Sequence, residues 1–230
     1  MPKKKTAAGR AIAPAGNTNL THLPERIAIG DHEVRPEQIY IIKDRRPRGQ
    51  GPWSDEGFDK IAWHDAESGL DCILLRQASG VWGGFVAVER GHPLYGYRED
   101  AIPAGAGLTP HGGIDYAEIC SRNKPEAVRV CHTRIGGRGA MLDTPNAEDQ
   151  TAADAWWFGF AADKPGDLVP SGSKPILARE EGEVYRGIDY MYEETIKLAR
   201  QLNGFEARGA IDAAPALAPP SPRLGKSGGR

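Results

Sequence analysis

Val81-Trp82-Gly83-Gly84-Phe85-Val86-Ala87-Val88 is the stretch on which the predicted fold depends. Its β-branched and aromatic side chains predict a buried strand. Two adjacent glycines weaken a strand unless it bulges or another group approaches closely, so Gly83 and Gly84 predict a bulge or a packing contact. The strand runs straight into the turn Gly91-His92-Pro93, which places His92 at a strand end.

A β-hairpin is predicted immediately upstream of this strand. Lys60–Asp65 alternates apolar and polar residues, Glu67–Leu70 has the composition of a turn, and Asp71–Arg76 resumes the strand pattern. Other short runs of apolar and β-branched residues predict further strands. They are Arg26–Gly30, Gln38–Lys43, Gly113–Ala117, Val128–His132 and Trp156–Phe160.

One helix is predicted, from Val184 to Leu202. Its apolar residues recur at helical spacing and form one face, and Asn203-Gly204 supplies a stop. That face needs a sheet to cover, which predicts an α+β fold with a twisted, mainly antiparallel sheet covered by one C-terminal helix. The face consists of Tyr185, Ile188, Met191, Tyr192, Thr195, Ile196, Ala199 and Leu202.

Composition divides the chain into four parts. We expect residues 1–20 to be a disordered basic arm and residues 21–50 to be a short β-containing lead-in. Residues 51–203 form the predicted main α+β domain, and residues 204–230 a disordered Ala/Pro-rich tail.

The charges of the whole chain nearly cancel, with 29 basic against 31 acidic side chains. The overall balance therefore gives no general reason to expect a nucleic-acid partner. Weak phosphate contacts are expected at most from two local basic groups, and a solvated surface segment is the more ordinary interpretation of each. The groups are Lys3, Lys4 and Lys5 in the first arm, and Arg45, Arg46 and Arg48 in a Pro/Gly loop.

Cysteine usage and hydropathy predict a soluble intracellular protein that is not secreted. Cys72, Cys120 and Cys131 match no paired C-x-x-C zinc pattern, and we expect them to be reduced and buried. No apolar segment follows the basic start, as a secretion signal would require. No apolar run approaches the roughly 20 residues that cross a bilayer, so no membrane partner is expected.

Two Gly/Pro turns each present a histidine, in Gly91-His92-Pro93 and in Pro110-His111-Gly112-Gly113. If His92 and His111 converge with Asp167, two imidazoles and a carboxylate form an adequate ligand set for a divalent metal, preferably Zn²⁺. A metal-bound water then becomes a nucleophile near neutral pH, with Asp115 or Asp163 as general base. The first hypothesis is therefore metal-assisted hydrolysis of a phosphate- or nucleotide-like ligand.

A pocket that binds a small polar ligand without catalysis is the second hypothesis. Aromatic side chains would stack on a planar ligand, while His111 and the amides of Gly112 and Gly113 would bond its polar edge. The aromatic residues proposed for this pocket are Trp82, Tyr95, Tyr116 and Trp156.

A structural or assembly role is the third hypothesis. Two low-complexity arms around a compact domain suit a virion or interaction protein whose flexible arms order on a protein partner. His92 and His111 would then cap turns by bonding backbone carbonyls, and Asp167 would accept backbone amides. For a single histidine beside glycine, this structural role is the more common one.

Short motifs follow one another in a fixed order between Gly51 and Leu202. They are Gly51-Pro52-Trp53; Trp63, Asp65, Ser68-Gly69 and Cys72; Gly84-Phe85-Val86-Ala87-Val88; Gly91-His92-Pro93; Tyr95-Gly96; His111-Gly112-Gly113-Ile114; Trp156-Trp157-Phe158-Gly159-Phe160; Gly166-Asp167; and Tyr185-Arg186. This ordered set resembles a widespread uncharacterised family common in tailed-phage and prophage genomes, and it covers about two-thirds of the chain. The resemblance implies a phage accessory protein of the host-cell cytoplasm, or a virion protein if the third hypothesis holds, and it carries no activity.

The sequence departs from that family in one region. After the Gly-Phe pair the family has Asp, Cys and His, whereas this chain has Ala161, Ala162 and Lys164. A cysteine often found in the family is replaced by Gly83. The comparison therefore implies a pocket with fewer polar groups, in which Asp163 and Asp167 are the carboxylates left to act.

Overall fold

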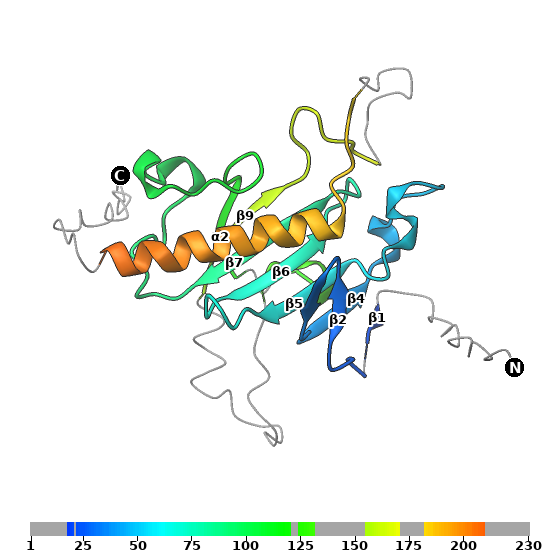
Figure 1. The fold of residues 1–230 in the computed structure, drawn as a ribbon, viewed down its shortest axis with the longest axis horizontal. Coiled ribbons are helices and arrows are strands. Elements are labelled where there is room, and N and C mark those ends of the chain that lie inside the picture. Colours follow the sequence, from blue (N-terminus) through cyan, green and yellow to red (C-terminus); the bar gives the residue numbers. More distant parts are fainter. Residues whose placement is uncertain (1–17, 21, 121–123, 132–154, 171–181, 210–230) are drawn as a thin grey trace, which may run out of the picture.

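The computed structural model describes residues 18–20, 22–120, 124–131, 155–170 and 182–209. Seven strands form one sheet in the order β1-β4-β5-β6-β7-β9-β8, and every strand pair in it is antiparallel. One long helix, α2 (Ile188–Gly209), lies across a face of this sheet (Figure 1). The predicted α+β fold with one covering C-terminal helix is confirmed.

The elements of the sheet and its connections are short. The strands are β1 (Thr18–Asn19), β4 (Gln38–Ile41), β5 (Lys60–His64), β6 (Asp71–Arg76), β7 (Trp82–Val88), β8 (Tyr116–Ile119) and β9 (Trp156–Ala161). A separate hairpin pairs β2 (Ile27–Ile29) with β3 (His32–Val34). Single 3-10 turns are η1 (Lys43–Arg45), η2 (Pro52–Asp55), η3 (Glu99–Ala101), η4 (Ala104–Ala106) and η5 (Glu126–Val128). Among the helices that the structure describes, none has the length and apolar character needed to span a membrane.

The prediction of a strand at Val128–His132 is wrong. Glu126–Val128 is the 3-10 turn η5, and the chain from Arg129 to Cys131 continues without a strand partner. The amides of Val128 and Arg129 donate to Pro125 O at 3.0 and 3.1 Å. Val130 is buried and Val128 partly buried against the sheet, but neither pairs with a strand, so their β propensity does not decide the local structure.

Both predicted ends of the helix are also wrong. The carboxylate of Glu56 accepts the amide of Ile188 at 3.1 Å, so the first helical turn starts at Ile188 rather than at Val184. At the other end the helix continues through Gly204 to Gly209. There the Phe205 ring lies 6.2 Å from that of His92, a tertiary contact that opposes the weak helix propensity of glycine.

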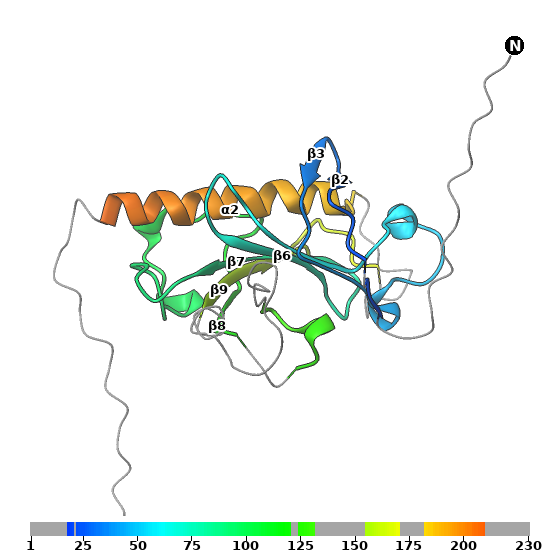
Figure 2. The same ribbon diagram turned by 90° about the horizontal axis from the view of Figure 1, so that it is seen from below.

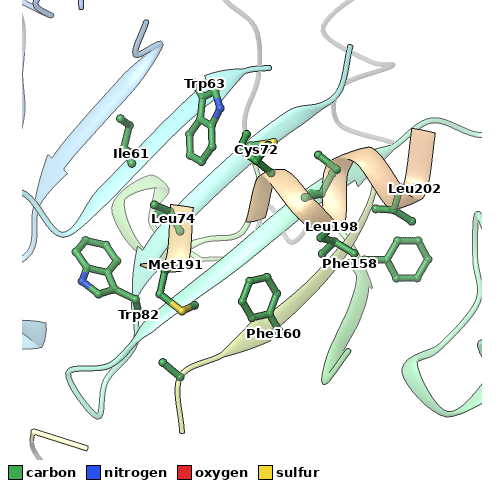
Figure 3. Packing of buried hydrophobic residues seen from close by; sticks show 14 of the residues in the cluster. Ile61, Trp63, Cys72, Leu74, Trp82, Phe158, Phe160, Met191, Leu198 and Leu202 are labelled. Atoms are coloured by element: carbon green, nitrogen blue, oxygen red, sulfur yellow. The ribbon is translucent and has the colours of Figure 1, made fainter. Parts of the chain in front are cut away.

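The sheet is buried on both faces, because successive side chains of each strand point to opposite sides. On the helix side Ile61, Trp63 and Leu74 belong to one core cluster with Met191 and Leu198 of α2 (Figure 3). Residues 124–131 run along the other face of the sheet (Figure 2). There Ala127 and Val130 share a core cluster with Ile73 and Leu75.

A disulfide joins Cys120 to Cys131, whose Cα atoms are 5.0 Å apart. The expectation that all three cysteines are reduced is therefore wrong, while Cys72 is free and buried as expected. The spacing of eleven residues gives no sign of this bond, which forms because η5 turns the chain back toward the end of β8.

Gly84 lies at a close packing contact between β7 and α2, as predicted for the glycine pair. A Cβ atom at Gly84 would overlap Thr195 Oγ1 and lie 2.8 Å from the ring of Phe160. Thr195 is fully buried, and its hydroxyl donates to Met191 O at 2.7 Å, so it has no room to move. The absence of a side chain therefore sets how closely α2 approaches β7.

We expect Gly84→Ala to destabilise the fold by about 1–3 kcal/mol, the usual cost of overpacking a core. Urea denaturation of the purified variant measures this change. Gly91→Ala is the matched control, because a Cβ atom there meets no atom within 4 Å. Equal stability of the two variants would contradict the proposed close approach.

A buried ion network fixes the start of α2. Arg76 has a fully buried side chain whose Nε donates to Asp59 Oδ1 at 2.9 Å and whose Nη2 pairs with Glu56. Glu56 also accepts from Trp82 Nε1 at 3.0 Å and from the Tyr185 hydroxyl at 2.8 Å. The Arg76 guanidinium stacks on the Trp82 ring at 4.3 Å. The carboxylate of Glu56 thus links Arg76 on β6 to the hydroxyl of Tyr185 and to the amide of Ile188 at the start of α2.

Replacing Glu56 with Gln should cost about 3–5 kcal/mol of unfolding free energy, since it leaves a buried arginine without one of its charged partners. Thermal and chemical denaturation test this. The control is Glu67→Gln, because Glu67 also pairs with a helix arginine, Arg200, but 65% of its side chain is exposed. Such surface pairs contribute about 0–1 kcal/mol, so similar losses in both variants would refute the role of the network.

Candidate functional site

A chain of hydrogen-bonded side chains joins three segments of the protein. They are the turn that contains His111, the loop that ends at Asp167, and the residues around the start of α2. His111 Nε2 lies 2.6 Å from Asp167 Oδ2, and His111 Nδ1 lies 2.9 Å from the Tyr190 hydroxyl. Arg186 Nε donates to Asp167 Oδ1 at 2.9 Å, and its guanidinium lies 4.7 Å from the centre of the Tyr190 ring. We refer to Asp167, His111, Tyr190 and Arg186 as the relay cluster.

Protonation of the relay cluster follows from its geometry. An ionised carboxylate only accepts hydrogen bonds, so a neutral His111 carries its proton on Nε2 and turns Nδ1 toward the Tyr190 hydroxyl as an acceptor. Burial raises the pKa of Asp167, but the hydrogen bonds from Arg186, His111 and the Lys164 amide outweigh it and hold that pKa below its usual value. Asp167 is therefore charged at neutral pH and orients the imidazole.

Tyr190 keeps its proton at neutral pH. Burial, and then the charge of Glu194, raise the pKa of its hydroxyl, while Arg186 acts in the opposite direction. A base held by a carboxylate and facing a hydroxyl is the arrangement of acid–base and nucleophilic sites in general. The relay cluster can therefore move a proton between Tyr190 and His111.

Local structure explains how distant residues meet in the relay cluster. Gly112 and Gly113 adopt φ values of +68° and +88°, and a side chain at Gly112 would overlap that of Lys164. A parallel β-bridge between Asp167 and Val184 holds the carboxylate beside the start of α2. Arg186 lies two residues before the helix, which starts at Ile188, and its side chain bonds Asp167. Tyr190 lies in the first turn of α2, and its hydroxyl bonds His111.

His92 does not join His111 and Asp167, which corrects the predicted three-residue ligand set. Its Nδ1 accepts the amide of Leu94 at 3.1 Å, and its Nε2 donates to Leu202 O at 3.0 Å. Leu202 and Tyr190 are twelve residues apart on α2, which is about 18 Å along a helix at 1.5 Å per residue. His92 is therefore a structural histidine that joins its turn to the end of the helix.

The predicted pocket residues divide into two groups. Asp115, Tyr116 and Trp156 line a cleft of about 340 Å³ along the edge strand β8, together with Arg98, Glu99, Ala117 and Glu118. The Tyr95 ring lies 6.0 Å from that of Trp156, but Tyr95 is not among the residues that line this cleft. Trp82 is fully buried against Arg76, so its placement in a ligand pocket is wrong.

Lys164 connects the cleft with the relay cluster. Its ammonium group pairs with Asp115 and with Asp163, at 3.1 Å in the second case, while its amide donates to Asp167 Oδ2 at 3.0 Å. Burial lowers the pKa of Lys164, but the hydrogen bonds to Asp115 and Asp163 outweigh it and raise that pKa. Lys164 thus lies as a cation between two carboxylates, and Ala161 and Ala162 contribute no polar side chain.

Of the two predicted basic groups, only the arginine loop lies among the described residues, and its arginines do not form one phosphate-facing patch. Arg45 Nη1 donates to Arg76 O at 2.7 Å, and Arg46 Nε donates to Asp59 Oδ1 at 3.3 Å, so two of the three loop arginines face the buried network. Arg48 is exposed. Lys3, Lys4 and Lys5, and the tail from residue 210 onward, lie outside the described residues.

A metal site stays a prediction. Within the parts of the chain that the structure describes, no group of three or more His, Cys, Asp or Glu side chains is arranged to hold a metal ion. His111 and Asp167 bond directly to each other, and His92 uses both ring nitrogens elsewhere. Of the predicted ligands, the structure thus brings His111 and Asp167 together and leaves His92 apart.

No protein-family model, curated protein or solved structure matches this chain. The resemblance of its motifs to the tailed-phage family thus stays a prediction. The site has to be interpreted from its own geometry, in which Tyr190 and Arg186 are the residues that sequence reasoning missed. No sequence signal pointed to them, because Arg186 precedes the helix and the partners of both residues lie on other segments of the chain.

We expect the cost of Asp167→Asn to depend on pH. The folded pKa of Asp167 lies below the unfolded value of about 3.9. The charged carboxylate therefore stabilises the fold fully above about pH 4, and this contribution is lost as the pH falls through the folded pKa. Urea titrations should show a difference from wild type of about 2 kcal/mol at pH 7 that shrinks toward about pH 2.

Asp163→Asn is the control for this measurement, because half of the Asp163 side chain is exposed. We expect it to change stability little at any pH. A difference between wild type and Asp167→Asn that does not vary with pH would contradict the ionised relay.

Proposed function

We propose that the chain binds a small phosphate- or nucleotide-like ligand beside Tyr190 and hydrolyses it with His111 as general base. The observation that carries this proposal is the hydrogen-bonded chain Asp167–His111–Tyr190, with a buried carboxylate at one end and a partly exposed hydroxyl at the other. His111 takes over the role of base that the sequence suggested for Asp115 or Asp163, since it alone is oriented by a buried charge.

The proton moves through Tyr190. As a water molecule attacks the phosphorus, it passes a proton to the phenolic oxygen, and the phenol passes its own proton to His111 Nδ1. The resulting imidazolium lies against Asp167, whose charge stabilises it. The bond from phosphorus to the ester oxygen breaks, and that oxygen leaves with the bonding electrons and takes up a proton from solvent.

Arg186 supports the choice of an anionic ligand. A guanidinium group has five N–H donors, and the bond to Asp167 uses Nε. The side chain is 29% exposed beside Tyr190, so its other donors can meet a phosphate oxygen. The cleft lined by Tyr116 and Trp156 offers aromatic faces for the planar part of a nucleotide-like ligand.

Hydrolysis of p-nitrophenyl phosphate and bis-p-nitrophenyl phosphate, followed at 405 nm in the presence and absence of added Zn²⁺, tests this function. We expect release of nitrophenolate by the wild-type chain and a loss of about 10²–10⁴-fold in kcat for His111→Gln and Tyr190→Phe. Arg186→Gln should mainly raise KM, because it removes a contact to the anionic ligand.

Tyr192→Phe is the matched control, because Tyr192 is on the same helix but packs against Trp63 and His32. It should keep wild-type kcat. Hydrolysis that persists unchanged in both His111→Gln and Tyr190→Phe, or no hydrolysis of either ester by folded wild-type protein, would overturn the proposed function.

A further inference from the structure

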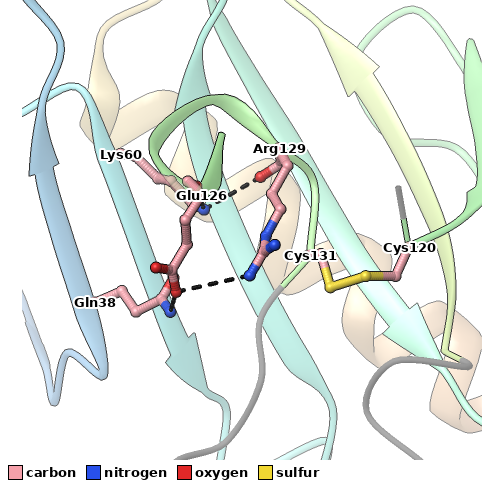
Figure 4. Close-up of a disulfide and its surroundings, with 6 residues drawn as sticks. All are labelled: Gln38, Lys60, Cys120, Glu126, Arg129 and Cys131. Carbon is pink, nitrogen blue, oxygen red and sulfur yellow. Dashed lines mark hydrogen bonds and ion pairs between the residues drawn. A yellow bond between two sulfur atoms is a disulfide. The ribbon is translucent and has the colours of Figure 1, made fainter. Parts of the chain in front are cut away.

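The segment Lys124–Cys131 lies across the sheet face opposite α2, and we call it the strap. The disulfide ties its last residue to Cys120, directly after β8 (Figure 4). The strap contributes three buried side chains to the apolar core on this face of the sheet, those of Ala127, Val130 and Cys131. They pack against residues that include Ala62 and Ile73. The strap is thus the cover of the sheet on this side, in the part of the chain that the structure describes.

Lys60 is sealed beneath the strap. Its side chain is fully buried, and its Nζ donates to Glu126 O at 2.6 Å and to Arg129 O at 3.1 Å (Figure 4). Gln38 Nε2 donates to Glu126 Oε1 at 2.7 Å, and the Tyr40 ring lies 5.3 Å from Lys60 Nζ. The polar contacts between sheet and strap therefore centre on one lysine.

The strap has few other attachments. Its described backbone hydrogen bonds run to Pro125, inside the strap itself, and its buried apolar side chains Ala127 and Val130 are small. Gln38 Oε1 and Arg129 Nε are buried at this interface without a protein hydrogen-bond partner among the described residues. Closure of the strap therefore depends strongly on the covalent bond between its end and β8.

We propose that the Cys120–Cys131 disulfide is a redox-operated latch, and that its reduction by a dithiol frees the strap and exposes Lys60 and the sheet face beneath it. A thiolate of the dithiol attacks one cysteine sulfur and breaks the S–S bond, which gives a mixed disulfide. The second thiolate of the reductant resolves it. Two electrons pass from the dithiol, which becomes a disulfide, and Cys120 and Cys131 each gain a proton as thiols.

Opening the latch changes the chemistry of this face. Burial lowers the pKa of Lys60 to about 7, with Glu126 raising it and with Arg129 and Arg45 lowering it. Contact with water removes that burial and gives a fully charged ammonium group beside the apolar side chains of Ile73 and Leu75. The oxidised and reduced forms thus present different surfaces on the side of the sheet away from the relay cluster's helix.

Lysine labelling tests the latch. The full chain is treated with acetic anhydride before and after reduction with dithiothreitol, and acetylation of Lys60 is followed by peptide mass spectrometry. The disulfide of a loop of this length is expected to shift the opening equilibrium by about 100-fold, so we expect at least a tenfold rise in the labelling rate of Lys60 after reduction. Exposed Lys197 should label equally in both states.

Two variants and one spectrum complete the experiment. The Cys120→Ser, Cys131→Ser double variant should label at Lys60 without reductant, whereas Cys72→Ala should behave as wild type. Far-UV circular dichroism should show that reduced wild-type protein keeps its helix. The latch is overturned if Lys60 stays protected after thiol titration shows both cysteines reduced, if Lys60 labels equally fast when oxidised, or if reduction unfolds the helix.

Discussion

The buried charge of Arg76 is the constraint on which the rest of the structure depends. Arginine cannot lose its proton, so its buried charge has to be neutralised where it lies, and Asp59 and Glu56 do so. Each carboxylate then holds another element, since Asp59 accepts the amide of Ile42 at 2.7 Å and Glu56 accepts that of Ile188. Replacing such a network by apolar residues need not weaken a protein, but removing one partner does. The main effect of the ion network in this protein is therefore to specify one arrangement of sheet and helix.

Sequence patterns revealed those parts of the fold that depend on neighbours in the chain. The hairpin of β5 and β6, the strand β7 and the centre of α2 follow from periodicity, and Gly84 follows from the cost of a glycine in a strand. The helix ends could not be predicted, because Glu56 and Phe205 determine them through contacts with residues far away in sequence. The strap was hidden for the same reason, since Lys60 and Glu126 are 66 residues apart. The disulfide joins cysteines only eleven residues apart, but that spacing gives no sign of a bond.

The candidate site shows the same division. Gly and Pro around His111 indicated a turn that presents a side chain, and Gly166-Asp167 indicated a second loop, and both take part in the relay cluster. His92 has equally suggestive neighbours, yet its ring bonds Leu202 O three helical turns away from Tyr190. Tyr190 itself looks like an ordinary position on a helix surface. A sequence shows which residues form a turn and which side chain the turn carries. It does not show which part of a helix that side chain contacts.

The ion network also determines when folding can finish. Glu56 and Ile188 are 132 residues apart, so the carboxylate that starts α2 is made long before the helix that it caps. At about 5–20 residues per second, a ribosome needs on the order of ten seconds to proceed from β7 to the end of α2. During that interval the helix side of the sheet has no cover, and contacts of such long range form slowly. The nascent chain therefore exposes apolar surface of the sheet until α2 has been synthesised.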